Sequence, residues 1–305
     1  MNDKTLSSTA RTSEPVTHLR AFFSLAYFLT WVLLAPAFYL YSVVLNHSIP
    51  WWLWLLVPFA FLGGAAPSIA GLVITARTEG RDAARRLVRS LVNGRLPFRW
   101  YLFTLLLPPA VTVLSIALVH HDRASWQPFS FSSALLNLPV AYALALPFGP
   151  LGEELGWRGY ALPRLLARFG PVAATLIIGV MWTFWHVPMM LWMPGASIPA
   201  FMGLTTFSVT VYLCQLTAQS AVMTLIYLRT GGSILMAVLA HLAFNTAGSV
   251  VFAGLPPFPI DHIRQIYLVK VAVLGLVGFA CLLWASREHR RQTSLTPIEV
   301  VKRGE

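Results

Sequence analysis

Apolar residues in this chain fall in long blocks separated by short polar stretches, and they do not alternate along the sequence. A helix needs about 20 predominantly apolar residues to cross the hydrocarbon core of a bilayer. The pattern therefore predicts an all-α fold, a polytopic membrane protein with about eight transmembrane helices. We expect these helices at residues 22–45, 51–76, 100–119, 132–155, 171–193, 201–228, 233–253 and 266–286.

The polar stretches between these blocks are too short for a separate folded domain, since the longest runs from Arg77 to Arg99. The first 20 residues lack the short apolar core and cleavage site of a signal peptide, so the first span is expected to remain as an anchor. We expect one integral-membrane domain over residues 1–305, made of a polar cytoplasmic N-terminus (1–21), an eight-helix core (22–286) and a polar cytoplasmic tail (287–305).

Composition and charge agree with a membrane protein. Only 11% of the residues are charged and 57% are hydrophobic, whereas soluble domains carry about 25% charged residues. The net charge of +11 could indicate nucleic-acid binding, but basic residues of membrane proteins gather in cytoplasmic loops. On the predicted topology 19 of the 22 Lys and Arg residues lie on one side, leaving Arg123, Arg264 and Lys270 on the other. Both termini are therefore expected in the cytoplasm, and no nucleic-acid partner is expected.

The location and redox context follow from residue usage. The chain holds 19 arginines and three lysines, which favours a bacterial protein in the inner or plasma membrane. Cys214 and Cys281 both fall inside apolar spans, so neither a disulfide nor a cysteine metal site is expected. Lys270, near the outer end of the last span, is expected to extend toward the interface.

Two adjacent carboxylates and an arginine interrupt the apolar sequence at Glu153, Glu154 and Arg158. A charge at the centre of a membrane helix costs at least about 2.5–3.5 kcal/mol, so such a cluster marks a functional site by default. Glu154 and Arg158 are four residues apart and are expected to form an ion pair on one helical face. Glu153 lies about 100° around the helix and is left free for chemistry.

Further polar side chains occur in later spans. His186 follows Trp182 by four residues, and Asn245 follows His241 by the same spacing, which places each pair on one helical face. Most histidines in a helix are structural, but two histidines, an asparagine and a carboxylate pair supply a base, an acid and an oxyanion donor. That set suits hydrolysis of a peptide bond by water.

The backbone around the carboxylates is expected to be irregular. Pro139, Pro147 and Pro150 should bend or break the outer part of a helix that continues to about Arg168. The next helix is expected to begin at Pro171, because proline suits the first helical turn. Glycines spaced three or four residues apart at 152, 156 and 159 favour close helix contact.

Other protease signatures are missing or weak. The chain has neither the His-Glu-x-x-His pattern of zinc peptidases nor the Gly-x-Ser-x-Gly pattern of serine hydrolases. Ser197 and His241 resemble a rhomboid serine–histidine pair only faintly, and a rhomboid site would leave Glu153 without a role.

The three motifs taken together resemble the CPBP (Abi) family, which contains the type II CAAX prenyl endopeptidases. The motifs are Glu153-Glu154-x-x-x-Arg158, an aromatic residue followed four positions later by His186, and His241-x-x-x-Asn245, spread over residues 150 to 250. In this family the second motif begins with phenylalanine, and here it begins with Trp182. This departure is expected to change the shape of the substrate pocket and to leave the chemistry intact.

The resemblance implies an intramembrane endopeptidase with a cavity open to the cytoplasm and to lipid. Glu153 and His186 would activate water, while His241 and Asn245 would stabilise the oxyanion. Glu154 and Arg158 would keep the site in shape, with Trp182 as support. The substrate would be a membrane-tethered peptide or protein. Two forms of the chemistry stay open: a divalent metal such as zinc could bind Glu153, His186 and His241, or these residues could act as acid and base groups without a metal. The lack of a tight local ligand spacing favours the metal-free form.

Two other functions remain open at this point. The motif residues could serve structure in a non-catalytic membrane scaffold, immunity or chaperone-like protein. A proton-coupled transporter would also use buried carboxylates and histidines, but transporters usually show corresponding broken helices in two halves, and here the polar residues lie in the second half of the chain.

Overall fold

The computed structural model describes residues 14–44, 55, 57–92, 94–120, 128–147, 149–192, 195 and 197–294. Within these ranges the regular structure is helical, which confirms the predicted all-α fold. The helices are α1 (Glu14–Val44), α2 (Val57–Gly64), α3 (Ala66–Thr78), α4 (Arg81–Arg89), η3 (Ser90–Val92), α5 (Phe98–Val119), α6 (Phe131–Ala145), α7 (Pro150–Glu154), η5 (Leu155–Ala161), α8 (Leu162–Trp185), α9 (Val187–Trp192), η6 (Ala200–Met202), α10 (Thr206–Arg229), α11 (Ile234–Ala253) and α12 (Ile260–Ser294).

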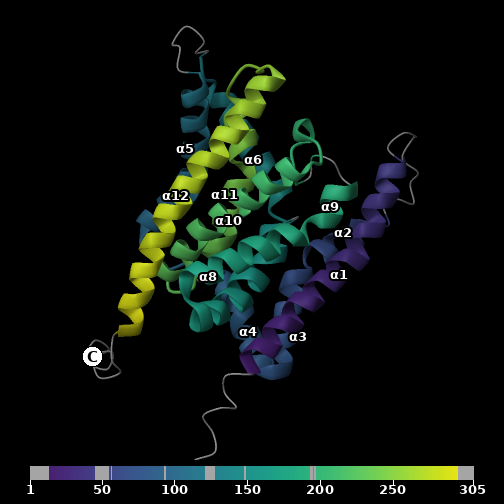
Figure 1. The fold of residues 1–305 in the computed structure, drawn as a ribbon, viewed down its shortest axis with the longest axis vertical. Helices are drawn as coiled ribbons and strands as arrows, with labels where there is room; N and C mark the ends of the chain where they lie inside the picture. The colour runs from purple at the N-terminus through teal and green to yellow at the C-terminus, as the bar shows by residue number, and fades with distance from the viewer. Residues whose placement is uncertain are drawn as a thin grey trace, which may run out of the picture.

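Helices α8, α10 and α11 form the centre of the molecule, between α1 and α3 on one side and α5 and α12 on the other (Figure 1). The first turns of α1, the short helix α4 and the last turns of α12 lie toward the same end (Figure 1). The start of α12 and the end of α5 lie at the opposite end. The first turns of α1 and the last turns of α12 therefore lie on the same side of the molecule.

Six described helices are long and apolar enough to cross a membrane, or seven if the bent pair Pro58–Gly64 and Ala66–Thr78 counts as one span. The chain is therefore a multi-pass membrane protein. The predicted count of eight is not established, because two predicted spans differ in form. The helix expected at 132–155 ends after 15 residues as α6, and the next span is continuous with the motif helix over Pro150–Trp192.

Several sequence expectations concern segments outside the described residues. These are the polar ends at 1–13 and 295–305, the beginning of the second predicted span at 51–54, and Arg123. The predicted cytoplasmic position of the termini stays a prediction.

The helix that carries the carboxylates is irregular, as the prolines predicted. The chain leaves α6 after Ala145 and begins α7 at Pro150, while Pro139 is accommodated inside α6. Residues Leu155–Ala161 then form a π-helical segment, a geometry that often occurs at functional sites. A second break lies at Gly170, whose φ of 72° is the left-handed region that glycine favours, and the helix resumes at Pro171 as predicted.

Close packing of α7 and η5 against the end of α2 and the start of α3 depends on glycine. A Cβ built on Gly156 would lie 2.3 Å from the carbonyl oxygen of Pro67, and one on Gly152 would lie 2.9 Å from that of Gly64. Neither backbone contact would tolerate a side chain, so the glycine spacing does permit the close approach expected from the sequence. This contact fixes the carboxylate-bearing turn against a neighbouring helix.

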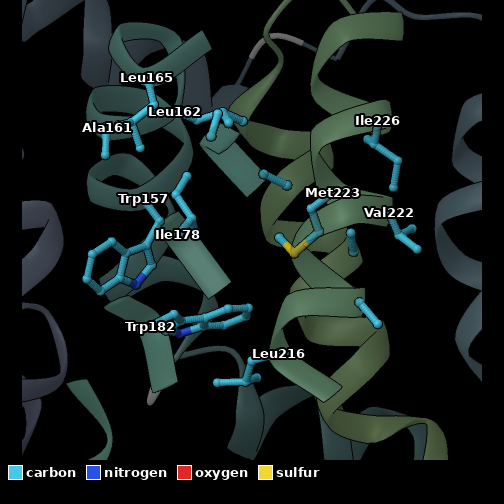
Figure 2. Close-up of a cluster of buried hydrophobic side chains, with 14 of the residues drawn as sticks. Trp157, Ala161, Leu162, Leu165, Ile178, Trp182, Leu216, Val222, Met223 and Ile226 are labelled. Carbon is cyan, nitrogen blue, oxygen red and sulfur yellow. The ribbon is translucent and has the colours of Figure 1, made fainter. Parts of the chain in front are cut away.

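The main hydrophobic core lies between η5, α8 and α10, as Figure 2 shows. Trp182 and Leu216 lie at one end of the cluster, and Leu165 and Ile226 lie at the other. The same cluster includes Leu19 of α1. Burial of apolar side chains thus joins the first helix to the motif-bearing helices.

Candidate active site

Three segments bring the predicted site residues together. Glu153 and Glu154 end the short helix α7, and Arg158 follows in the π-helical segment η5. His186 directly follows α8 as its C-cap residue. His241 and Asn245 lie on α11, which packs against α5, α6, α7 and α10. The tertiary fold therefore gathers side chains that are up to 92 positions apart in the sequence, counted from Glu153 to Asn245.

Glu154 is the centre of a buried charge network. Its two carboxylate oxygens accept hydrogen bonds from Nη1 of Arg158 at 2.9 and 3.1 Å, so the predicted ion pair is present. Oε1 of Glu154 also lies 2.8 Å from Nδ1 of His241. Arg158 donates further to Oγ of Ser220 at 3.3 Å. Glu154 and Arg158 are almost fully buried, at 0% and 1% exposure. Each charge is therefore shielded from water and is stabilised by its partner in the ion pair.

Glu153 points away from this network and meets two indoles. Its Oε2 accepts hydrogen bonds from Nε1 of Trp157 at 3.1 Å and from Nε1 of Trp182 at 2.6 Å. Two donors on one carboxylate oxygen stabilise its charge and hold the side chain in one orientation. The other oxygen, Oε1, is turned toward the side chains of α11. Glu153 is thus a fixed carboxylate with one oxygen left for chemistry.

Sequence reasoning missed both indole contacts. Trp182 was expected to be an aromatic wall, and the departure from phenylalanine was expected to affect only pocket shape. In the structure its indole N–H supplies a hydrogen bond to Glu153 that phenylalanine could not make. Its ring also lies under the guanidinium of Arg158, 4.4 Å from centroid to Cζ. Trp157 follows Glu153 by four residues, so the helical spacing could have indicated this contact.

His186 is oriented by the backbone of its own helix. Its Nδ1 lies 2.8 Å from the carbonyl oxygen of Trp182. A carbonyl oxygen only accepts, so Nδ1 carries the proton and Nε2 is the basic nitrogen of the neutral ring. The imidazole packs edge-on against Trp185 and Tyr212, at 4.8 and 5.4 Å between ring centroids.

One cavity of about 710 Å³ connects the separate parts of the site. Glu153, His186, His241 and Asn245 all line it, together with Trp182. Glu154 and Arg158 lie behind this wall and do not line the cavity. The cavity lining thus divides the motif residues into two groups. The four polar side chains reach the cavity, whereas the ion pair of Glu154 with Arg158 lies outside it and contacts His241.

Gly149 marks the point at which the polar atoms converge. A Cβ built on this residue would lie 3.4 Å from Oε1 of Glu153, 3.4 Å from Nδ2 of Asn245 and 3.6 Å from Nε2 of His241. The missing side chain therefore leaves a small space bounded by three polar atoms. Sequence reasoning did not single out this glycine.

The residues proposed as metal ligands do not form a ligand set in this geometry. Over the part of the chain that the structure describes, no three His, Cys, Asp or Glu side chains converge closely enough to hold an ion. Glu153, His186 and His241 thus do not fit a metal centre here.

Replacing Gly149 with alanine tests the importance of the small space between the polar atoms. The added methyl group would make ordinary van der Waals contacts, so we expect an unfolding midpoint close to that of the wild type. Because the same methyl group fills the space next to Glu153 Oε1, catalytic activity should fall at least about tenfold through displaced water. A matched control is Gly275→Ala on α12, where nothing lies within 4 Å of an added Cβ. Equal activity of both variants would contradict this reading.

Comparison with known proteins agrees with the motif pattern. Residues 135–247 match the family model described as type II CAAX prenyl endopeptidase Rce1-like. This segment contains all three motifs. The chain is also 26% identical over 227 residues to CAAX prenyl protease 2 of Methanococcus maripaludis, covering 73% of this chain and 79% of that protein. These similarities support a protease that acts within the membrane. Together with the motifs, they confirm the resemblance of this chain to the CPBP family of CAAX proteases.

Proposed function

We propose that this protein is an intramembrane endopeptidase that hydrolyses a peptide bond of a membrane-associated protein or peptide. The observation that carries the proposal is the convergence of Glu153 Oε1, His241 Nε2 and Asn245 Nδ2 around Gly149. These atoms border a cavity large enough for a peptide segment. A base, a hydrogen-bond donor and a histidine around one small space are the groups that peptide hydrolysis requires.

Water activation is assigned to Glu153, with His186 as its partner across the cavity. The free oxygen of Glu153 takes a proton from water as the water attacks the substrate carbonyl carbon. The two indole N–H groups keep the carboxylate fixed during this step. The unprotonated Nε2 of His186 accepts a hydrogen bond and orients the water or the substrate. The proton then passes to the leaving amine as the peptide bond breaks.

Stabilisation of the oxyanion is assigned to Asn245 and His241. The amide of Asn245 donates directly, as in other oxyanion sites. His241 donates through Nε2 only when its ring is a cation, because Nδ1 already donates to Glu154. The carboxylate of Glu154, 2.8 Å from Nδ1, fixes the orientation of the ring so that Nε2 faces the cavity.

Glu154 and Arg158 position His241 and do not touch the substrate in this proposal. Their burial behind the cavity wall supports this assignment. We further propose that the whole chain, 1–305, forms one integral-membrane domain around the site. In support of this, one hydrophobic cluster extends from Leu19 on α1 to Ala285 on α12. The mechanism proposed here uses no metal ion, and the membrane is taken to be a bacterial inner or plasma membrane.

Removing the side chain of Asn245 tests the hydrolytic mechanism. In proteoliposomes that contain a membrane-tethered reporter, Asn245→Ala should lower kcat by about 10²–10³-fold, with KM little changed, because the donor acts mainly in the transition state. The measurement is the rate of reporter cleavage on gels, with the wild-type protein as reference. Unchanged cleavage by Asn245→Ala would contradict the assignment, and complete loss of wild-type cleavage on removal of divalent ions would contradict the metal-free mechanism.

A further inference from the structure

The walls of the active-site cavity come from one half of the molecule. Beyond the motif residues, most of the lining comes from residues toward the end of α5 and α11, from the first half of α10 and α12, and from the segment between α9 and α10. Residues of α1, α2 and α9 complete it. These ends lie toward the side of the molecule opposite to α4 (Figure 1). Representative lining residues are Thr112, Phe252, Tyr212, Tyr267 and Phe201.

The other half of the molecule is filled by large side chains. Trp157 and Tyr160 of η5, Leu162 of α8, Ile226 of α10 and Ile234 of α11 are all fully buried. Figure 2 shows this packing extending from Trp182, which lines the cavity, toward Leu165. Well-packed interiors leave few voids larger than a water molecule. The site is therefore closed by packed side chains toward one end and hollow toward the other.

The closed and hollow ends of the molecule differ in their content of Lys and Arg. The closed end includes α4 with its arginines, the last turn of α10 with Arg229 and the last turns of α12. At the hollow end, the basic side chains among the described residues are Arg264 and Lys270. Cytoplasmic ends of membrane helices carry the excess of Lys and Arg. The distribution of Lys and Arg therefore places the packed end on the cytoplasmic side of the membrane.

We infer that the cavity opens to the extracytoplasmic face, so that water and substrate reach Glu153 from outside the cytoplasm. If the proposed protease function holds, its substrate is a peptide segment exposed on that face of the membrane. This reverses the cytoplasmic opening that the family resemblance implied. The difference arises because the resemblance concerns the motifs, whereas the direction of opening depends on which end of each helix carries the basic residues.

Polar side chains along the cavity support access from this end. Lys270 lines the cavity on α12, and its ammonium lies 5.2 Å from the ring centroid of Tyr267. Gln215 lines the same wall, and its buried Oε1 has no hydrogen-bond partner among the residues that the structure describes. Ionic side chains within spans typically face a water-filled cavity. These groups would be satisfied by water that enters from the hollow end.

Thiol labelling in spheroplasts tests the direction of opening without relying on activity. In a Cys214→Ser, Cys281→Ala background, single cysteines are introduced by Phe201→Cys and Ile263→Cys, both at the cavity lining. The matched position is Val92→Cys in η3, which is 80% exposed at the arginine-rich end. The probe is a membrane-impermeant maleimide, applied before and after permeabilisation, and labelling is measured only for membrane-inserted protein.

If the cavity opens to the extracytoplasmic face, the three introduced cysteines should differ in their rate of labelling. Phe201→Cys and Ile263→Cys should be labelled in intact spheroplasts at least about tenfold faster than Val92→Cys, and permeabilisation should raise the labelling of Val92→Cys alone. Labelling of Val92→Cys in intact spheroplasts, with the cavity cysteines protected, would overturn the inference. Protection of all three until permeabilisation would overturn it as well. Because the readout does not involve cleavage, either result leaves the proposed hydrolysis to be judged separately.

Discussion

Replacement of Glu153 by glutamine is expected to lower the rate of substrate cleavage by about 10²–10⁴-fold, the range for loss of a general base. Glutamine keeps an oxygen that can accept the hydrogen bonds of Trp157 and Trp182. The side chain therefore should keep its place while losing its ability to take a proton from water. The measurement is single-turnover cleavage of a membrane-tethered reporter by the reconstituted variant.

A suitable control makes the same chemical change at another carboxylate. Glu79 lies at the end of α3, is about half exposed and pairs with Arg164 outside the cavity. Glu79→Gln should therefore retain wild-type activity. Retained activity of Glu153→Gln would remove the basis for an enzymatic role of this carboxylate. An inactive Glu153→Gln variant with a lowered unfolding midpoint would instead favour a structural role, as in a non-catalytic scaffold.

Replacement of Arg158 by methionine is expected to destabilise the fold by about 3–5 kcal/mol, as measured for other buried ion pairs that lose one partner. Arg158 is 1% exposed, and both of its hydrogen bonds to Glu154 would be lost. The carboxylate would then be buried with His241 as its remaining partner. Denaturant unfolding of the purified protein in detergent, followed by tryptophan fluorescence, measures the change in the free energy of unfolding.

Two further variants distinguish the effect of breaking the buried ion pair from the effect of removing an arginine side chain. Arg164→Met removes an arginine whose pairing with Glu79 is partly exposed, and exposed pairs contribute only about 0–1 kcal/mol. The double variant Glu154→Leu/Arg158→Met removes both buried charges, so it should be more stable than Arg158→Met alone. It should nevertheless be inactive, because His241 loses the carboxylate that positions it. A double variant no more stable than the single one would contradict this account.

Some features of the fold could be predicted from local sequence. The breaks near Pro150 and Pro171 followed from the restricted backbone of proline. Span length was harder to predict, because hydropathy does not show where an apolar block is interrupted. The block expected to be one helix at 132–155 contains the gap between α6 and α7, and the block at 51–76 contains a bend of 62°.

The partners within the site were only partly predictable. The ion pair of Glu154 with Arg158 depends on helical spacing, which the sequence contains. The hydrogen bonds from Trp182 to Glu153 and from His241 to Glu154 join residues 29 and 87 positions apart. No periodicity relates such residues, since the contacts depend on how α8 and α11 pack against α7. Gly149 was overlooked for the same reason.

By itself, the sequence determined that the protein is helical and embedded in a membrane, and it determined which residues belong to the three motifs. These properties follow from hydropathy, residue spacing and the cost of charge in hydrocarbon. The tertiary structure alone decided which oxygen of Glu153 is free, which carboxylate holds His241 and toward which end the cavity lies. Those properties depend on side chains from separate helices meeting at defined distances, and the packing that brings them together is not encoded at any one position.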